Sequence, residues 1–247
     1  MDSFKTSDTW GPYIARYRAG EWRDRIFRDM LLGDVAAIGG KPTILDIGCG
    51  EGLDGSVELQ RSIAEAAGRF IGIEPDPAVV LGDHFTETLR CCFEQAPLTP
   101  GSIDLAYAVM VLEHLPQPQV FWDKLFEVLV PGGIFWGLTV DARHIFSRFS
   151  LWADRLRIKN LYMDFVLGRA ADSGRYRNYP TYYRTNTPVE ILGFARSFRS
   201  AEFINFSRVG QWSPYLPRSL RGIARGIDAR SIRKQQPGTL LAVRVVK

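Results

Sequence analysis

Short apolar runs, separated by segments of helical periodicity, fill the middle of the chain. Four runs are predicted strands, mostly apolar as in strands covered on both faces of a sheet: 43–47, 69–73, 103–109 and 134–140. Two segments between them carry apolar residues at helical spacing and are predicted helices, 56–68 and 118–129. The alternation predicts an α/β fold with a doubly wound, mostly parallel sheet and ligands at the carboxyl ends of its strands.

Weaker signals complete this pattern. An amphipathic helix is predicted over 21–38, where two glycines end it, and Tyr13 and Tyr17 precede it. These tyrosines either pack on the sheet, which is the alternative we favour, or close over a ligand. A helix over 76–89 and a short strand over 90–93 are predicted between the second and fourth strands.

The first predicted strand leads into a glycine turn. The strand contains Asp46 and is followed by Gly48, Cys49 and Gly50. Glycines let the backbone turn sharply beside a ligand, and a strand, a glycine turn and a helix together form a nucleotide-cofactor site. The turn by itself does not specify which cofactor binds.

Glu74 directly follows the second predicted strand. An ionised carboxylate has two acceptor oxygens and is suited to bind both hydroxyls of a ribose. The alternative is a solvated loop acid, but a position at the end of an apolar strand favours the ribose role.

Five segments, in order, resemble the motifs of class I S-adenosylmethionine-dependent methyltransferases with a type 11-like domain. They lie at 44–52, 72–75, 96–105, 111–115 and 129–133, so the resemblance covers about residues 40–140. It implies S-adenosyl-L-methionine as the cofactor. It also implies a seven-stranded, Rossmann-like sheet that ends in an antiparallel C-terminal hairpin, for which 201–209 and 239–246 are the matching strands.

The resemblance also implies which residues bind the methionine part of the cofactor and its ribose. Asp46 would anchor the glycine turn, and Gly48, Cys49 and Gly50 would pass the methionine part. Glu74, which Pro75 follows, would hold the ribose hydroxyls.

For the adenine and the methyl group, the resemblance points to the next two strands. Phe93 and Glu94 would flank the adenine, and Val109 and Met110 would lie near the transferable methyl group. Cys92 stands where family members often have Asp as the acceptor for the adenine amino group, so Glu94 or a backbone carbonyl would replace that contact.

The segment 141–188 has no counterpart in the shared fold and is predicted to be a substrate-cap insertion. It is rich in arginine and aromatic residues, and Tyr183 and Arg184 are candidate polar contacts for an acceptor. The alternative is a cap that only packs on the core. We expect one methyltransferase domain over the whole chain. It would consist of an N-terminal helical cap (1–40), a cofactor-binding core (41–140), the acceptor cap (141–188) and a C-terminal part (189–247).

Methyl transfer to a hydroxyl is helped by a base. His114, just past the fourth strand, is the first candidate because histidine titrates near neutral pH. The alternative for His114 is a structural role at the entry to a helix, and His144, Asp141 and Tyr183 are the other candidate bases. The end of the fourth strand, 108–110, has no carboxylate cluster, so no metal is expected.

Charge and cysteine content bear on location. The three cysteines show neither a disulfide pattern nor zinc-ligand spacing, and the first residues lack the pattern of a signal peptide, so we expect a cytoplasmic protein. The basic stretch 218–234 is either a solvated face, which we favour, or a weak contact with the inner membrane surface. No nucleic-acid motif is present, so no nucleic-acid partner is expected.

The leading hypothesis is therefore methyl transfer to a small-molecule, saccharide or lipid-linked acceptor, at oxygen. Two alternatives stay open. One is a nucleotide-dependent oxidoreductase of Rossmann type, which the acid before the glycine turn disfavours. The other is a non-catalytic module that binds the cofactor.

Overall fold

The computed structural model describes residues 8–145, 147–148, 179–211, 216 and 218–247. Its centre is a seven-stranded sheet in the order β3-β2-β1-β4-β5-β7-β6. The strands are β1 (Thr43–Ile47), β2 (Arg69–Ile73), β3 (Glu87–Leu89), β4 (Ile103–Val109), β5 (Leu129–Val140), β6 (Ser200–Phe206) and β7 (Leu240–Val246). The first five pair in parallel, and β7 is antiparallel to both β5 and β6. The predicted doubly wound sheet with its antiparallel C-terminal strands is confirmed.

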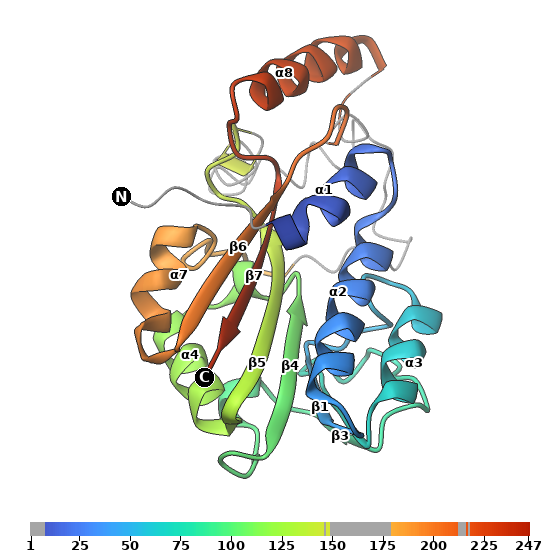
Figure 1. Cartoon of the computed structure of the whole chain (residues 1–247), viewed down its shortest axis with the longest axis vertical. Coiled ribbons are helices and arrows are strands. Elements are labelled where there is room, and N and C mark those ends of the chain that lie inside the picture. The colour runs from blue at the N-terminus through green and yellow to red at the C-terminus, as the bar shows by residue number, and fades with distance from the viewer. Residues whose placement is uncertain (1–7, 146, 149–178, 212–215, 217) are drawn as a thin grey trace.

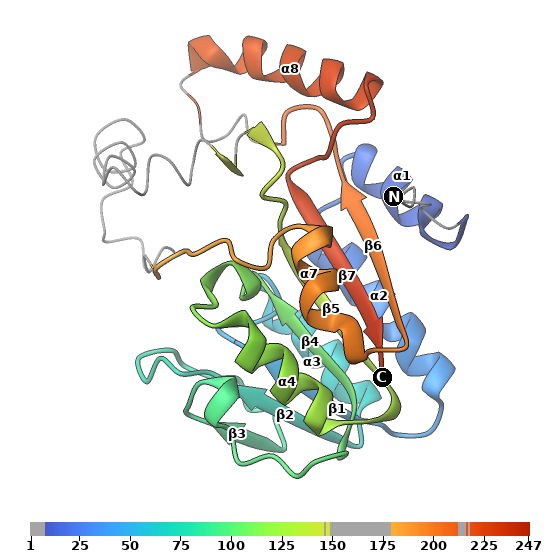
Figure 2. The same ribbon diagram turned by 90° about the vertical axis from the view of Figure 1, so that its left-hand side faces the viewer.

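Helices cover both faces of this sheet (Figure 1). One face carries α1 (Gly11–Arg18), α2 (Arg23–Ile38) and α3 (Val57–Ala66), and the other carries α4 (Pro118–Val128) and α7 (Pro188–Phe194). A further helix, α8 (Arg221–Arg233), lies apart from these layers, beyond the carboxyl ends of β4 and β5 (Figures 1 and 2).

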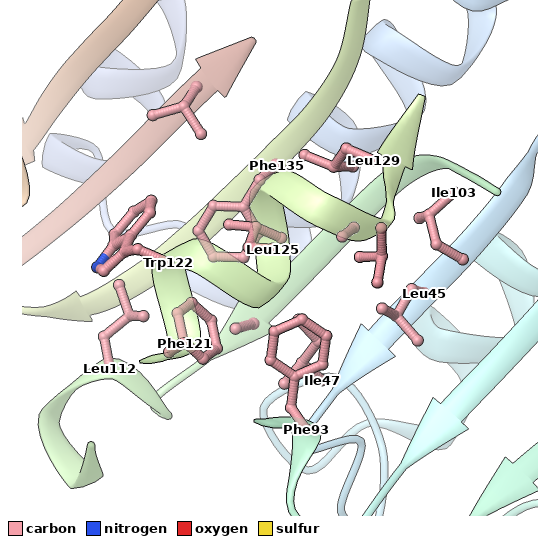
Figure 3. Close-up of a cluster of buried hydrophobic side chains, with 14 of the residues drawn as sticks. Leu45, Ile47, Phe93, Ile103, Leu112, Phe121, Trp122, Leu125, Leu129 and Phe135 are labelled. Atoms are coloured by element: carbon pink, nitrogen blue, oxygen red, sulfur yellow. The ribbon is translucent and has the colours of Figure 1, made fainter. Parts of the chain in front are cut away.

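The alternation of side chains along β1 explains these two layers. Leu45 and Ile47 point to one face, where Phe121 and Leu125 of α4 meet them in a wholly apolar cluster (Figure 3). Ile44 points to the other face and packs in the cluster that α2 contributes to. Strand residues on both faces are buried, as in a parallel sheet between two helical layers.

The segment between β2 and β4 differs from its prediction. No helix forms over 76–89, and the third strand is Glu87–Leu89, earlier than the predicted 90–93, where a 3-10 turn begins at Phe93. The segment instead runs back along β2: Phe85 stacks on Phe70 at 4.8 Å between ring centroids. Thr86 donates its backbone N–H to the Phe70 carbonyl, and its hydroxyl accepts the Phe70 N–H. These contacts to a buried strand outweigh a weak helical propensity.

The N-terminal tyrosines separate into two environments. Tyr17 is buried and packs edge-to-face on Phe206 of β6 at 5.4 Å, and burial raises the pKa of its hydroxyl to about 12. Tyr13 is half-buried beside Trp10. The packing alternative therefore describes Tyr17 in this structure.

Candidate functional site

In the turn after β1, the backbone passes close to the Val111 side chain. Gly48 and Gly50 have φ values of 70° and 51°, in the left-handed region that favours glycine. A Cβ on Gly48 would lie 2.5 Å from the Cγ2 atom of Val111. The N–H groups of Gly48 and Cys49 donate to the Ile73 carbonyl at 2.8 and 3.0 Å, which fastens the turn to the end of β2.

Glu74 lies directly against this turn. Its carboxylate is buried, and it accepts the Gly50 N–H at 3.1 Å on one oxygen and the Asp76 N–H at 2.9 Å on the other. A carboxylate oxygen accepts more than one hydrogen bond, so each retains acceptor capacity. The structure thus joins two features that the sequence placed in separate motifs, the glycine turn and the acid after β2.

Asp46 is buried beneath the turn. Its Oδ2 accepts the Tyr107 hydroxyl at 2.6 Å and the Gln60 side-chain amide at 2.7 Å. The same amide nitrogen also donates to the Cys49 carbonyl at 2.8 Å, so Gln60 links Asp46 to the turn. Burial raises the pKa of Asp46 to about 7, because the charged form is poorly solvated there.

Sequence reasoning missed Gln60 and Tyr107. Each carries a signal that was available. Gln60 is an amide on the buried side of a helix next to the turn, and a buried amide needs partners. Tyr107 is the only hydroxyl-bearing residue in β4, and it pairs in register with Asp46 on the neighbouring strand.

The predicted adenine and methyl contacts lie at the ends of neighbouring strands. Phe93 is buried in the apolar cluster, edge-to-face against Phe121 at 5.0 Å, while Glu94 is half-buried (Figure 3). Val109 and Met110 are half-buried at the carboxyl end of β4. Met110 has a φ of 56°, and such strain in a non-glycine residue is found most often at functional sites. Pro75 is exposed beside Glu74.

A strap formed by residues 179–187 crosses the carboxyl ends of these strands. At its start, the Tyr179 hydroxyl donates to the Asp76 carboxylate at 2.7 Å, two residues beyond Glu74. Next, His114 Nδ1 lies 2.8 Å from the Pro180 carbonyl. A carbonyl only accepts, so Nδ1 carries the hydrogen and the neutral ring keeps its lone pair on Nε2.

Further along the strap, contacts to Glu113 fix its path. The backbone N–H groups of Tyr182 and Tyr183 both point at the Glu113 carbonyl, at 2.8 and 3.3 Å. Tyr183 has a φ of 50°, again in the left-handed region. The exposed Arg184 donates to the Pro116 carbonyl at 2.6 Å and lies over the Tyr182 ring. The two predicted acceptor contacts, Tyr183 and Arg184, thus belong to the strap.

A buried polar chain lies where the strap meets β5. Glu113 accepts the Thr139 hydroxyl at 2.7 Å, and Thr139 in turn accepts the Asn186 side-chain amide at 2.7 Å. Asn186 also donates to the Val140 carbonyl at 3.2 Å. Burial raises the pKa of Glu113. The Glu113-His114 pair therefore joins the strap to the sheet.

The other two candidate bases sit at the end of β5. Asp141 is fully buried, where it pairs with Arg143 at 2.6 Å and accepts the Asn205 amide at 2.9 Å. His144 is also buried, and burial lowers its pKa. Asp141 thus holds local structure together, and of the candidate bases His114 has the clearest geometry.

Within the described residues, no three or more His, Cys, Asp and Glu side chains gather as metal ligands would. None of the helices described is both long enough and apolar enough to cross a membrane.

Part of the chain is similar in sequence to known proteins. Residues 45–137 match the family model of the methyltransferase domain. An uncharacterized methyltransferase of Mycobacteroides abscessus is 34% identical over 101 residues, which are 37% of this chain and 37% of that protein. An uncharacterized methyltransferase of Mycobacterium leprae is 24% identical over 176 residues, 67% of this chain and 59% of that protein. The chain thus spans less than two thirds of the length of these curated relatives.

Solved structures agree on the fold. A SAM-dependent methyltransferase from Archaeoglobus fulgidus gives a TM-score of 0.57 at 10% identity, over 94% of this chain and 97% of that chain. At this identity the likeness concerns the fold alone, and the chemistry must be argued from the site.

Proposed function

We propose that the chain is a class I S-adenosylmethionine-dependent methyltransferase, which transfers a methyl group from this cofactor to an oxygen of a small-molecule, saccharide or lipid-linked acceptor. One observation carries the cofactor part of the proposal. The Glu74 carboxylate accepts the Gly50 N–H, so an acid suited to bind a ribose and a turn with two glycines lie side by side at the carboxyl edge.

The chain's residues suit S-adenosyl-L-methionine in shape and in hydrogen bonding. A Cβ at Gly48 would clash with Val111, so this position of the turn accepts only glycine. Glu74 keeps acceptor capacity on both carboxylate oxygens. In this proposal Glu74 holds the ribose hydroxyls, and Val109 and Met110 face the reacting end of the cofactor.

The cofactor supplies a methyl group already activated by a positive sulfur, so the protein chiefly has to align the acceptor and exclude water. We propose that His114 acts as the general base. The Pro180 carbonyl holds the Nδ1 hydrogen, which leaves the Nε2 lone pair to take the proton of an acceptor hydroxyl. Tyr183 and Arg184, on the strap, are the proposed polar contacts of the acceptor.

The binding test is calorimetry with S-adenosyl-L-methionine on the full chain. We expect binding in the micromolar range that Glu74→Gln abolishes. Glu127→Gln is the matched control, because Glu127 is an exposed acid on α4, paired only with Lys124 among the described residues. Absence of binding to the unmodified protein, or equal binding by Glu74→Gln, overturns the proposal.

The same calorimeter separates the two alternatives. Tight binding of NAD in place of S-adenosyl-L-methionine supports the oxidoreductase. Cofactor binding without any methylated product supports the non-catalytic module. To find the acceptor, small-molecule and lipid extracts of cells with and without the gene are compared by mass spectrometry for a difference of one methylene group.

We also propose a cytoplasmic location. The three cysteines are free thiols, and Cys49 is buried, as expected of a protein kept in a reducing compartment.

A further inference from the structure

Helix α8 buries little of its surface against the rest of the molecule. Of its side chains only Ala224 and Asp228 are buried. The Asp228 carboxylate accepts the Gly210 N–H at 2.7 Å, which fixes the helix to the end of the β6 segment. Both views show α8 beyond the carboxyl ends of β4 and β5, the edge that holds the candidate site (Figures 1 and 2).

The outer surface of α8 and the turn before it is strongly basic. Six cationic side chains are exposed here: Arg218, Arg221, Arg225, Arg230, Arg233 and Lys234. Asp228 is the one acid of this stretch, and it is turned inward. The exposed charge is therefore of a single sign.

Apolar side chains lie among these cations. Leu220 is 44% exposed and Ile223 is 63% exposed, and they are three positions apart in the chain, so they lie on neighbouring positions of the helix surface. Gly222 and Gly226 face open space, since a Cβ at either position would meet no atom within 4 Å. Nothing in the described chain covers this face of α8.

We propose that α8 and its preceding turn bind the surface of an anionic lipid bilayer. The arginines would meet the negative headgroups, while Leu220 and Ile223 would enter the boundary with the acyl chains. The exposed aliphatic pair is what favours a membrane over a nucleic acid, since phosphate contacts need charge alone. Binding in this way turns the carboxyl edge of the sheet toward the bilayer.

This surface is independent of the methyl-transfer proposal, because no residue of the cofactor turn takes part in it. It has one implication for the acceptor, which would then be a molecule held at or in the membrane. A bilayer-borne acceptor would reach the strap without leaving the lipid.

The experiment is flotation of the full chain with vesicles, in the absence of cofactor. Vesicles of phosphatidylcholine are compared with vesicles that also contain phosphatidylglycerol. We expect binding to the anionic vesicles only, weakened about tenfold or more by Arg230→Glu/Arg233→Glu. Leu220→Ser/Ile223→Ser should also weaken binding, without any change in charge.

The matched control is Arg196→Glu/Arg199→Glu. These two exposed arginines lie before β6, at the opposite edge of the sheet, and their reversal changes net charge by the same amount. The control should bind like the unmodified protein, and circular dichroism should show that every variant is folded. Equal binding to neutral vesicles, or equal loss in the control, overturns the proposal.

A final arm uses a single-stranded RNA oligonucleotide. RNA binding that depends on Arg230 and Arg233 but is indifferent to Leu220 and Ile223, with no vesicle binding, assigns the surface to nucleic acid and overturns the membrane proposal. Calorimetry with S-adenosyl-L-methionine on the same variants should be unchanged, so failure here is distinct from failure of the cofactor site.

Discussion

The carboxylate of Asp46 accepts the hydroxyl of Tyr107 at 2.6 Å inside the sheet, beneath the glycine turn that Asp46 was expected to anchor. Both residues sit at the same register of adjacent strands. The acid is therefore linked to the turn through Gln60 and is buried away from water. The raised pKa of Asp46 should make the stability of the folded protein depend on pH.

Asp46 should make the protein less stable as the pH rises from about 4 to about 7. Its pKa is raised from 3.8 to about 7 on folding, so the folded state binds a proton that the unfolded state has lost in this range. Between these two pKa values, Asp46 lowers the free energy of unfolding by up to ~1.4 kcal/mol for each unit of pH increase. Below the unfolded-state pKa, its contribution does not change with pH.

Urea unfolding between pH 4 and pH 8 measures this effect. Asp46→Asn keeps an acceptor for Tyr107 and cannot titrate, so the difference in unfolding free energy between the two proteins should change with pH as stated. Parallel curves for the two proteins would show that Asp46 keeps an ordinary pKa.

Gly48→Ala should abolish cofactor binding. The added Cβ would meet Val111 at 2.5 Å, and the backbone would also be strained at a φ of 70°. Gly40→Ala is the matched control, since Gly40 has a φ of 65° and open space around it, so it carries the strain without the clash.

Calorimetry should show lost binding for Gly48→Ala and normal binding for Gly40→Ala. The double variant Gly48→Ala/Val111→Ala relieves the clash and should regain part of the affinity. Normal binding by the single Gly48 variant would mean that the turn has room for a side chain.

Thr139→Val should destabilise the protein by ~1–3 kcal/mol. It removes the hydroxyl between Glu113 and Asn186 and leaves both buried groups short of a partner. Thr139→Ser restores the hydroxyl and should recover most of the loss. Chemical denaturation of the three proteins decides this, and an unchanged midpoint for the valine variant contradicts it.

His114→Asn should lower kcat by ~10²- to 10⁴-fold while leaving cofactor affinity unchanged. The asparagine amide nitrogen stands where Nδ1 does and can still donate to the Pro180 carbonyl, so the strap is kept while the base is lost. The variant lacks the proposed base, so the pH profile of its rate should differ from that of the unmodified enzyme. An unaltered pH profile would assign His114 to a structural role only.

The sequence predicted the cofactor half of the fold because its signals are local. The run ending at Asp46, the glycines after it and the acid Glu74 each follow a strand, and strand ends meet at one edge. The helix over 76–89 failed for the opposite reason. Phe85 and Thr86 are held by contacts with Phe70, a residue that local propensity does not take into account.

The strap shows the same limit at longer range. Its contacts join Tyr179 to Asp76 and Asn186 to Thr139, pairs separated by 103 and 47 positions in the chain. Periodicity gave no sign of them, because they are side-chain hydrogen bonds between segments far apart in the chain. The residue types were noticed, since the tyrosines and Arg184 stood out, but their partners were not predictable.

The order of the last strands bears on how the protein is made. β7 lies between β5 and β6, although it follows both in the chain. During synthesis β6 therefore emerges from the ribosome with no neighbour to pair with, and β5 presents an open apolar edge until residues 240–246 follow. The sheet can close only after translation has passed that point, and until then its unpaired strand edges are open to contact with other chains.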